Sequence, residues 1–287
     1  MAHKTNKAGG SRRQTLKRLL LSVVAIYVLV CIGCASWQRS LIYYPPHFPA
    51  ERVDESAQQA GMERWRDAAG HAIGMKRLSA RQPAAGKLLI VYGNGSWSVG
   101  CAHYADDLQR VVPFDVFILE YPGYADRAGK PTERNLFQAA DEAWPALGTN
   151  QPVYVLGESL GSGVAAYLAG THPGQVAGMI LLSPYNRLAG PAHTRMPFLP
   201  VSLLLVDRFA SEDYLKPYHG PVGIVVDGCD TIVPEKFGRL LFNGYGGPKQ
   251  LWEFPAGQHI QVMESPGQFW REVVSFWQTN RPVQQKP

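Results

Sequence analysis

The chain has 287 residues, of which 46% are hydrophobic, and this is enough for one domain whose sheet is covered on both faces. Its net charge of +5 comes from a basic N-terminal tail, because without the six basic residues there 22 basic residues face 23 acidic ones. The rest of the chain is nearly neutral, so its charge gives no reason to expect a nucleic-acid partner.

The N-terminal segment is predicted to cross a membrane. Residues 1–18 form a basic tail that contains Lys4, Lys7, Arg12, Arg13, Lys17 and Arg18. The next 18 residues, 19–36, carry no charge and would span about 27 Å as a helix, close to the roughly 30 Å hydrocarbon core of a bilayer. Because basic flanks stay in the cytoplasm, we expect a single-pass signal anchor with the C-terminal domain on the periplasmic or extracellular side.

Two other interpretations of this segment stay open. A cleaved signal peptide would release a secreted protein, although the apolar stretch is long for one. A lipoprotein signal is the third interpretation, because Gly33 places a small residue before Cys34. Against it, Cys31 occupies a position where leucine is usual.

Apolar runs separated by helix-like stretches predict an α/β fold, with a mostly parallel central sheet and helices on both faces. The runs expected to form its strands are residues 87–92, 115–120, 153–157, 178–183 and 222–227, with a short strand at 250–254. Residues 41–44 and 73–79 are candidates for antiparallel strands at the start of the sheet. The C-terminal tail, residues 281–287, is predicted to be disordered.

Residues 157–161 read Gly-Glu-Ser-Leu-Gly, directly after apolar residues and before a helix-like stretch at 164–169. A nucleophilic serine on a tight strand-to-helix turn needs small residues two positions away on either side, because the backbone doubles back there. The following helix then points its N-terminus at the developing oxyanion. This pentapeptide pattern occurs once in the chain, and it makes Ser159 the candidate nucleophile.

A serine nucleophile in this architecture is followed along the chain by an acid and then by a histidine. Asp227 and Asp230 follow the predicted strand 222–227, and His259 follows the strand after it. Because the carboxyl ends of parallel strands meet at one edge of the sheet, these side chains are expected near Ser159. We predict Asp230 as the acid and His259 as the base. Asp227 is the alternative acid, but its place at the strand end is also that of a residue that only caps the turn.

Several segments carry a resemblance to a known family. They are Leu-Ile-Tyr-Tyr-Pro-Pro at 41–46, Val-Tyr-Gly-Asn-Gly at 91–95, Glu-Tyr-Pro-Gly-Tyr-Ala at 120–125 with Gly-Lys-Pro-Thr-Glu at 129–133, and apolar stretches within 197–209. Over about residues 38–280 the chain resembles the α/β-hydrolase superfamily, and within it the membrane-tethered serine hydrolases of the ABHD and serine-aminopeptidase-like type. It departs from the family pattern at Tyr92, where histidine is usual, and at Ala125, where glycine is usual. The sequence of the turn expected to carry the acid, Asp-Gly-Cys-Asp at 227–230, is also unusual for the family.

The resemblance implies an α/β-hydrolase fold with a short lid, expected at about residues 186–218. It also implies that the backbone N–H groups of Leu160 and Asn94 form the oxyanion hole, although residues 93–96 could equally be a plain glycine-rich turn. The lid stretch is too apolar for an ordinary surface loop, and a helix packed on the core is the alternative. Because the membrane segment ends near residue 36, such a lid would lie close to the bilayer and could admit lipid-like acyl chains from it.

These residues together predict a serine hydrolase that cleaves acyl esters or thioesters, with a small-molecule or lipid-like acyl substrate. A peptidase or amidase of the same fold, and a non-catalytic binding protein, are the alternatives. No Cys/His cluster has zinc spacing and no dinucleotide-binding fingerprint follows a strand, so we expect no cofactor and no metal. Cys101 and Cys229 are expected to be unpaired small core residues, and a disulfide between them is the alternative.

Overall fold

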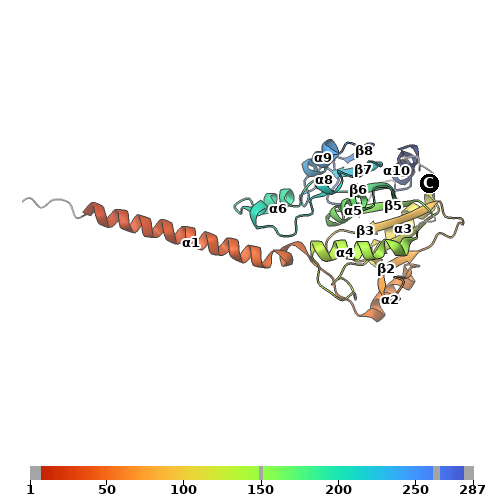
Figure 1. Cartoon of the computed structure of the whole chain (residues 1–287), viewed down its shortest axis with the longest axis horizontal. Helices are drawn as coiled ribbons and strands as arrows, with labels where there is room; N and C mark the ends of the chain where they lie inside the picture. Colours follow the sequence, from red (N-terminus) through yellow and green to blue (C-terminus); the bar gives the residue numbers. More distant parts are fainter. Residues whose placement is uncertain (1–7, 149–150, 261–265, 281–287) are drawn as a thin grey trace, which may run out of the picture.

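The computed structural model describes residues 8–148, 151–260 and 266–280, and the predicted disordered tail at 281–287 lies outside them. The described residues build a body around an eight-stranded sheet, from which a long N-terminal helix projects (Figure 1). The strand order is β1-β2-β4-β3-β5-β6-β7-β8, and every neighbouring pair from β4 onward in this order is parallel. The predicted α/β fold with a mostly parallel sheet is confirmed.

The six strands of the parallel part agree with the predicted runs to within two residues at each end. They are β3 (Gly86–Val91), β4 (Phe114–Leu119), β5 (Val153–Glu158), β6 (Val176–Leu182), β7 (Val222–Asp227) and β8 (Lys249–Phe254). Every residue of β3 to β7 is buried. Strands covered on both faces read as continuous apolar runs, which is why the sequence located them well.

Two antiparallel strands complete the sheet on the β4 side. β2 (Ala72–Arg77) pairs with β4 and lies where a strand at 73–79 was expected. β1 (Glu63–Arg66) pairs with β2 and was not predicted. Three of its four residues are charged and only Trp65 is buried, so no apolar run marks this strand in the sequence.

The N-terminal helix α1 (Ala8–Ile42) contains the whole predicted membrane segment and continues beyond it. Its stretch Arg13–Ile42 is long and apolar enough for a membrane span or a signal sequence, and none of its apolar window is buried. The predicted strand at 41–44 is wrong. The helix continues to Ile42, whose carbonyl oxygen accepts a hydrogen bond from the Asn94 side-chain amide, and the following Pro45 and Pro46 have no N–H to give to a sheet.

Helices cover both faces of the sheet. On one face α3 (Ala102–Val111) contacts α10 (Pro266–Asn280), while α4 (Glu133–Ala143), α5 (Leu160–Thr171), α8 (Ser211–Tyr214) and α9 (Glu235–Gly244) form a second connected group. Side chains alternate along a strand, and in β5 Tyr154 stacks on Trp277 of α10 whereas Gly157 faces Ala165 of α5. The two groups therefore lie on opposite faces. The short helices η1 (Val99–Cys101) and η2 (Pro145–Leu147) contact α3 and α4, respectively, and α2 (Ala50–Gln59) contacts β1.

Between β6 and β7 the chain leaves the sheet for residues 183–221, which include the expected lid at 186–218. This insertion contains α6 (Ala189–Arg195), α7 (Val201–Leu204) and α8. Figure 1 shows α6 on the same side of the body as α1, and α7 contacts α1 directly. The insertion and the N-terminal helix thus meet at one end of the molecule.

The stacking of Trp277 against β5 predicts a large stability effect. Trp277 is fully buried, its ring centroid lies 4.5 Å from that of Tyr154, and its indole N–H donates to the Met179 carbonyl at 3.1 Å. We expect Trp277→Ala to lower the free energy of unfolding by about 3–5 kcal/mol, because it leaves a cavity under the sheet. Chemical denaturation measures the change, and Gln278→Ala on the exposed face of α10 should shift it by less than about 0.5 kcal/mol.

Candidate active site

Ser159 lies on a strained turn between β5 and α5. Its φ of 48° and ψ of −115° fall in a region that residues with a side chain rarely adopt. Its backbone N–H donates to the Leu182 carbonyl of the neighbouring strand at 2.9 Å, which fixes the turn to the sheet. The turn lifts the serine above the carboxyl edge of the sheet, as the Gly-x-Ser-x-Gly spacing predicts.

The two glycines of the pentapeptide are required by close backbone approach. A Cβ atom at Gly157 would lie 2.6 Å from the Cβ of Ala165, and one at Gly161 would lie 2.1 Å from the Val91 carbonyl oxygen. Real Cβ atoms do not tolerate such distances, so neither position accepts a side chain. The first turn of α5 can therefore rest directly on the end of β3, beside the Gly93–Gly95 turn.

The structure brings the three predicted side chains together. Nε2 of His259 lies 3.0 Å from Oγ of Ser159, and Nδ1 lies 2.6 Å from Oδ2 of Asp230. With its proton on Nδ1, the imidazole donates to the Asp230 carboxylate and leaves Nε2 free to accept the serine proton. The Asp230 side chain is only 1% exposed and that of His259 15%, so water has little access to this chain of hydrogen bonds.

The turn after β7 holds the Asp230 carboxylate in place. Its Oδ1 accepts the backbone N–H groups of Ile232 at 2.7 Å and Val233 at 2.8 Å, which leaves Oδ2 for His259. A carboxylate that accepts backbone hydrogen bonds cannot rotate away without losing them. The imidazole is thus oriented by a fixed anion.

Asp227, the alternative acid, has other partners. It accepts a hydrogen bond from the Ser183 hydroxyl at 2.8 Å and one from the backbone N–H of Ile260. Burial raises the pKa of the Asp227 carboxyl, and the hydrogen bond from Ser183 lowers it in part. Asp227 therefore joins the end of β6 to the loop that carries His259, and its contacts are those of a structural support.

The residues of the two expected oxyanion donors, Leu160 and Asn94, line the same cavity as Ser159. Leu160 is the first residue of α5, where backbone N–H groups have no partner within the helix. The Asn94 side chain is already engaged: its Oδ1 accepts the N–H of Tyr44 at 2.8 Å and the hydroxyl of Tyr124 at 2.9 Å, and its amide caps Ile42. With its side chain held in this way, Asn94 is expected to serve an oxyanion through its backbone N–H.

A buried network under the Gly93 turn was missed in the sequence. Glu158, next to the serine, accepts hydrogen bonds from the Tyr104 hydroxyl at 2.6 Å and from the Gly93 N–H at 3.2 Å. Glu120 accepts hydrogen bonds from the hydroxyl of Tyr92 and from the backbone and hydroxyl of Ser98. Burial raises the pKa of Glu120. Tyr92, which replaces the family's histidine, thus acts as a buried donor that supports the turn from below.

The two cysteines outside α1 are both free. Cys101 is buried, as expected of a small core residue, and its thiol lies 3.3 Å from the Ser96 hydroxyl. Cys229 is exposed, so its assignment to the core is wrong: it occupies the turn after β7, between the buried Asp227 and Asp230. Within residues 8–148, 151–260 and 266–280 no group of three or more His, Cys, Asp or Glu side chains is placed to hold a metal ion.

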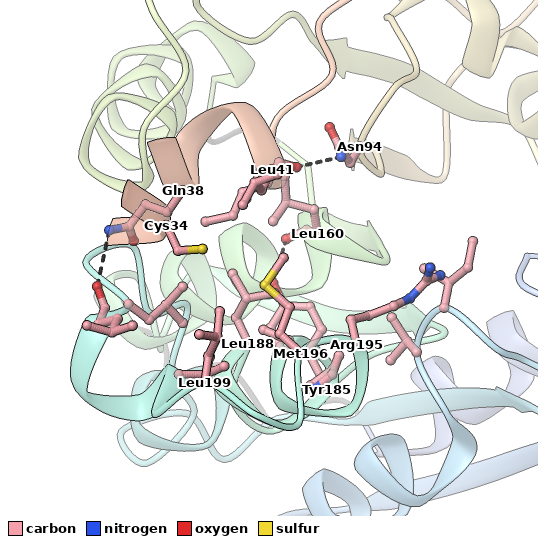
Figure 2. Close-up of a pocket in the computed structure, with 18 of the residues that line it drawn as sticks. Cys34, Gln38, Leu41, Asn94, Leu160, Tyr185, Leu188, Arg195, Met196 and Leu199 are labelled. Atoms are coloured by element: carbon pink, nitrogen blue, oxygen red, sulfur yellow. Dashed lines mark hydrogen bonds between the residues drawn. The ribbon is translucent and has the colours of Figure 1, made fainter. Parts of the chain in front are cut away.

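A cavity of roughly 640 Å³ opens in front of Ser159 and His259 (Figure 2). Most of its lining is apolar and comes from three parts of the chain: α1, the turn at Asn94, and the insertion between β6 and β7. Figure 2 shows Leu188, Met196 and Leu199 of the insertion facing Cys34 and Leu41 of α1 across it. The volume falls within the range of about 300–1,000 Å³ that is usual for small-molecule sites.

Comparison with known proteins agrees with this architecture. Residues 87–218 match the family model described as alpha/beta hydrolase fold. An uncharacterized protein of Mycobacterium tuberculosis is 31% identical over 259 residues, which cover 85% of this chain and 90% of that protein. Human alpha/beta hydrolase domain-containing protein 17B is 29% identical over 198 residues, covering 66% of this chain and 65% of that protein.

Solved structures share the fold at low sequence identity. An esterase from Pyrococcus furiosus superposes with a TM-score of 0.62 and 15% identity, covering 84% of this chain and 98% of the esterase. A monoacylglycerol lipase from Paleococcus ferrophilus gives a TM-score of 0.53 and 18% identity, covering 71% of this chain and 97% of the lipase.

The contacts of the two aspartates predict different effects on turnover. Asp230→Asn keeps an oxygen for the two turn N–H groups but removes the anion beside His259, and we expect kcat to fall by about 10²–10⁴-fold. Asp227→Asn keeps an acceptor for Ser183 and should lower kcat by less than about tenfold. Ester hydrolysis by the two variants measures the ranking, and the reverse order would assign the acid to Asp227.

Proposed function

Because this chain belongs to the α/β-hydrolase superfamily, we propose that it is a serine hydrolase that cleaves acyl esters or thioesters through an acyl-enzyme on Ser159. The observation that carries the proposal is the aligned hydrogen-bond chain of Ser159, His259 and Asp230, with distances of 3.0 and 2.6 Å. A binding protein on the same fold has no need of this geometry or of the strained serine backbone.

The proposed reaction follows from which atoms face each other. Nε2 of His259 takes the proton from Oγ of Ser159 as the oxygen attacks the acyl carbonyl, and Asp230 stabilises the imidazolium that forms. The N–H groups of Leu160 and Asn94 hold the negative oxygen of the tetrahedral intermediate. The imidazolium then gives its proton to the departing alcohol or thiol. In the second half of the reaction His259 deprotonates a water molecule, which attacks the acyl-enzyme. The carboxylic acid is then released and Ser159 recovers its proton.

The substrate is proposed to be lipid-like because the cavity beside Ser159 is mostly apolar. The likeness to an esterase and a monoacylglycerol lipase is consistent with acyl esters. A peptidase or amidase of the same fold is the second candidate. A panel of acyl esters of varied chain length, tested beside aminoacyl amides, would separate the two activities.

We propose that α1 anchors the enzyme in a membrane as a single span, with the catalytic domain on the non-cytoplasmic side. The length and hydropathy of Arg13–Ile42 and the basic residues near its start support this arrangement. Signal cleavage or lipidation at Cys34 would give a secreted protein or a lipoprotein instead. Mass spectrometry of the mature N-terminus distinguishes these three forms.

The proposed nucleophile can be tested with a matched pair of serines. We expect Ser159→Ala to abolish both ester hydrolysis and covalent labelling by a fluorophosphonate, because the attacking oxygen is lost. Ser162→Ala, one turn further along α5, removes a buried hydroxyl that has no hydrogen-bond partner in the described part of the chain. This control should keep both signals. Labelling of the Ser159→Ala protein would disprove the assignment.

The proposed anchor predicts how a shortened chain behaves. A chain that begins near residue 37 keeps the hydrogen bonds of Gln38 and Tyr43 to the insertion, and we expect it to be water soluble and to cleave short soluble esters. The full-length protein should be faster on acyl substrates embedded in vesicles. Equal rates of the two proteins on vesicle-borne substrate would reduce α1 to a tether.

A further inference from the structure

The C-terminal part of α1 forms one side of the cavity in front of Ser159. Cys34, Gln38 and Leu41 all line it, and their spacing of four and then three residues puts them on one face of the helix. In Figure 2 these three side chains face the apolar residues of the insertion across the cavity. A helix that served only as a tether would have no reason to present a face to the site.

Hydrogen bonds hold the insertion against this helix. The Gln38 side-chain amide donates to the Leu204 carbonyl at 3.1 Å, and its oxygen accepts the Val206 N–H at 2.7 Å. The buried carboxylate of Asp207 accepts hydrogen bonds from Arg39 at 3.2 Å and from the Tyr43 hydroxyl at 3.0 Å. The segment around α7 and the end of α1 therefore form one unit, with the cavity between α1 and the insertion.

The tip of the insertion extends alongside the apolar part of α1. The Tyr27 hydroxyl donates to the Phe198 carbonyl at 2.9 Å. Tyr27 lies nine residues before Ser36, which corresponds to about 13 Å along a helix. In the membrane orientation proposed above, Phe198 therefore lies beside the membrane-spanning part of α1 and within the thickness of the bilayer.

Large apolar side chains stand outward near this tip, although Ser202 and Arg195 are exposed there as well. Phe198 is 87% exposed and Leu203 is 84% exposed. Trp37 of α1, which directly follows the predicted membrane segment 19–36, is 75% exposed. Large apolar side chains with this exposure are unfavourable in water but stable among lipid tails, and tryptophan prefers the membrane interface. The exposed faces of the tip and of α1 thus match one environment, the outer half of a bilayer.

We propose that α1 is a wall of the acyl-binding cavity and that the acyl chain of a membrane lipid passes from the bilayer to Ser159 between α1 and the insertion. This inference rests on the proposed hydrolase function and adds its substrate class, a lipid resident in the membrane. Because the lining of the cavity is mostly apolar, the acyl chain stays largely out of water along this path.

A matched pair of tryptophan substitutions in the full-length protein tests the wall. Cys34→Trp places a large ring in the cavity, whereas Ile32→Trp places it about 200° around the helix, on a lipid-facing position that is already 56% exposed. The readout is the ratio of hydrolysis of a long-chain ester in phosphatidylcholine vesicles to hydrolysis of a soluble acetyl ester. We expect Cys34→Trp to lower this ratio at least tenfold and Ile32→Trp to change it by less than twofold. A ratio unchanged by Cys34→Trp, or lowered equally by both variants, would overturn the proposal.

A second measurement needs neither turnover nor a bulky substitution. The Ser159→Ala protein is placed in vesicles that contain a phosphatidylcholine with a diazirine at the end of one acyl chain, and the cross-linked residues are found by mass spectrometry after illumination. We expect cross-links at Cys34 and Met196, which line the cavity, as well as at the exposed Phe198 and Leu203. Cross-links confined to the first 30 residues would contradict the proposal. Failure of the proposed hydrolase function itself would give a different result, because the Ser159→Ala protein would then hydrolyse esters at the wild-type rate.

Discussion

Helix α5 begins so close to strand β3 that a Cβ atom at Gly161 would lie 2.1 Å from the Val91 carbonyl oxygen. This contact fixes where the helix N-terminus points, and it forces the residue before the helix, Ser159, into a backbone with φ of 48°. Leu160 and Asn94, the residues of the proposed oxyanion donors, line the same cavity as the serine. A shift of the helix by the size of one methyl group would separate the two proposed oxyanion donors, so the site depends on this steric constraint.

The sequence predicted the parts of the site that arise from local sterics and from strand order. The Gly-x-Ser-x-Gly motif can be recognised in the sequence because a side chain at either glycine would clash with the start of the following helix or with the adjacent strand. The order of acid and histidine is readable because parallel strands end at the same edge. The sequence distinguishes Asp227 from Asp230 less clearly, because Asp227 ends β7 and Asp230 lies three residues later. What separates them is their partners from distant parts of the chain, Ser183 for Asp227 and His259 for Asp230. Their catalytic roles stay predictions.

Features that depend on long-range polar contacts could not be predicted. Residues 41–44 were a candidate strand because the segment 41–46 resembles the opening strand of the family, but the Asn94 side chain caps the helix at Ile42 from 52 residues away. The burial of the carboxylates Glu120 and Glu158 was not predicted from the sequence. Their partners, among them Tyr92 and Tyr104, come from other strands and helices, and a single sequence carries no sign of these pairings. Strand β1 could not be recognised in the sequence because its side chains are mostly charged and its pairing with β2 uses backbone hydrogen bonds.

Asn94 connects α1 to the proposed site. Its side-chain amide donates to the last helical carbonyl of α1, its side-chain oxygen accepts the Tyr44 N–H, and the residue lines the same cavity as Ser159. Gln38 adds two more directional hydrogen bonds to the insertion one turn earlier. A helix held at two successive turns cannot rotate about its axis without breaking both sets of contacts, so the face with Cys34 and Leu41 stays directed at the cavity. If α1 spans a membrane as proposed, the orientation of the domain relative to the bilayer is set by the same contacts that shape the proposed active site.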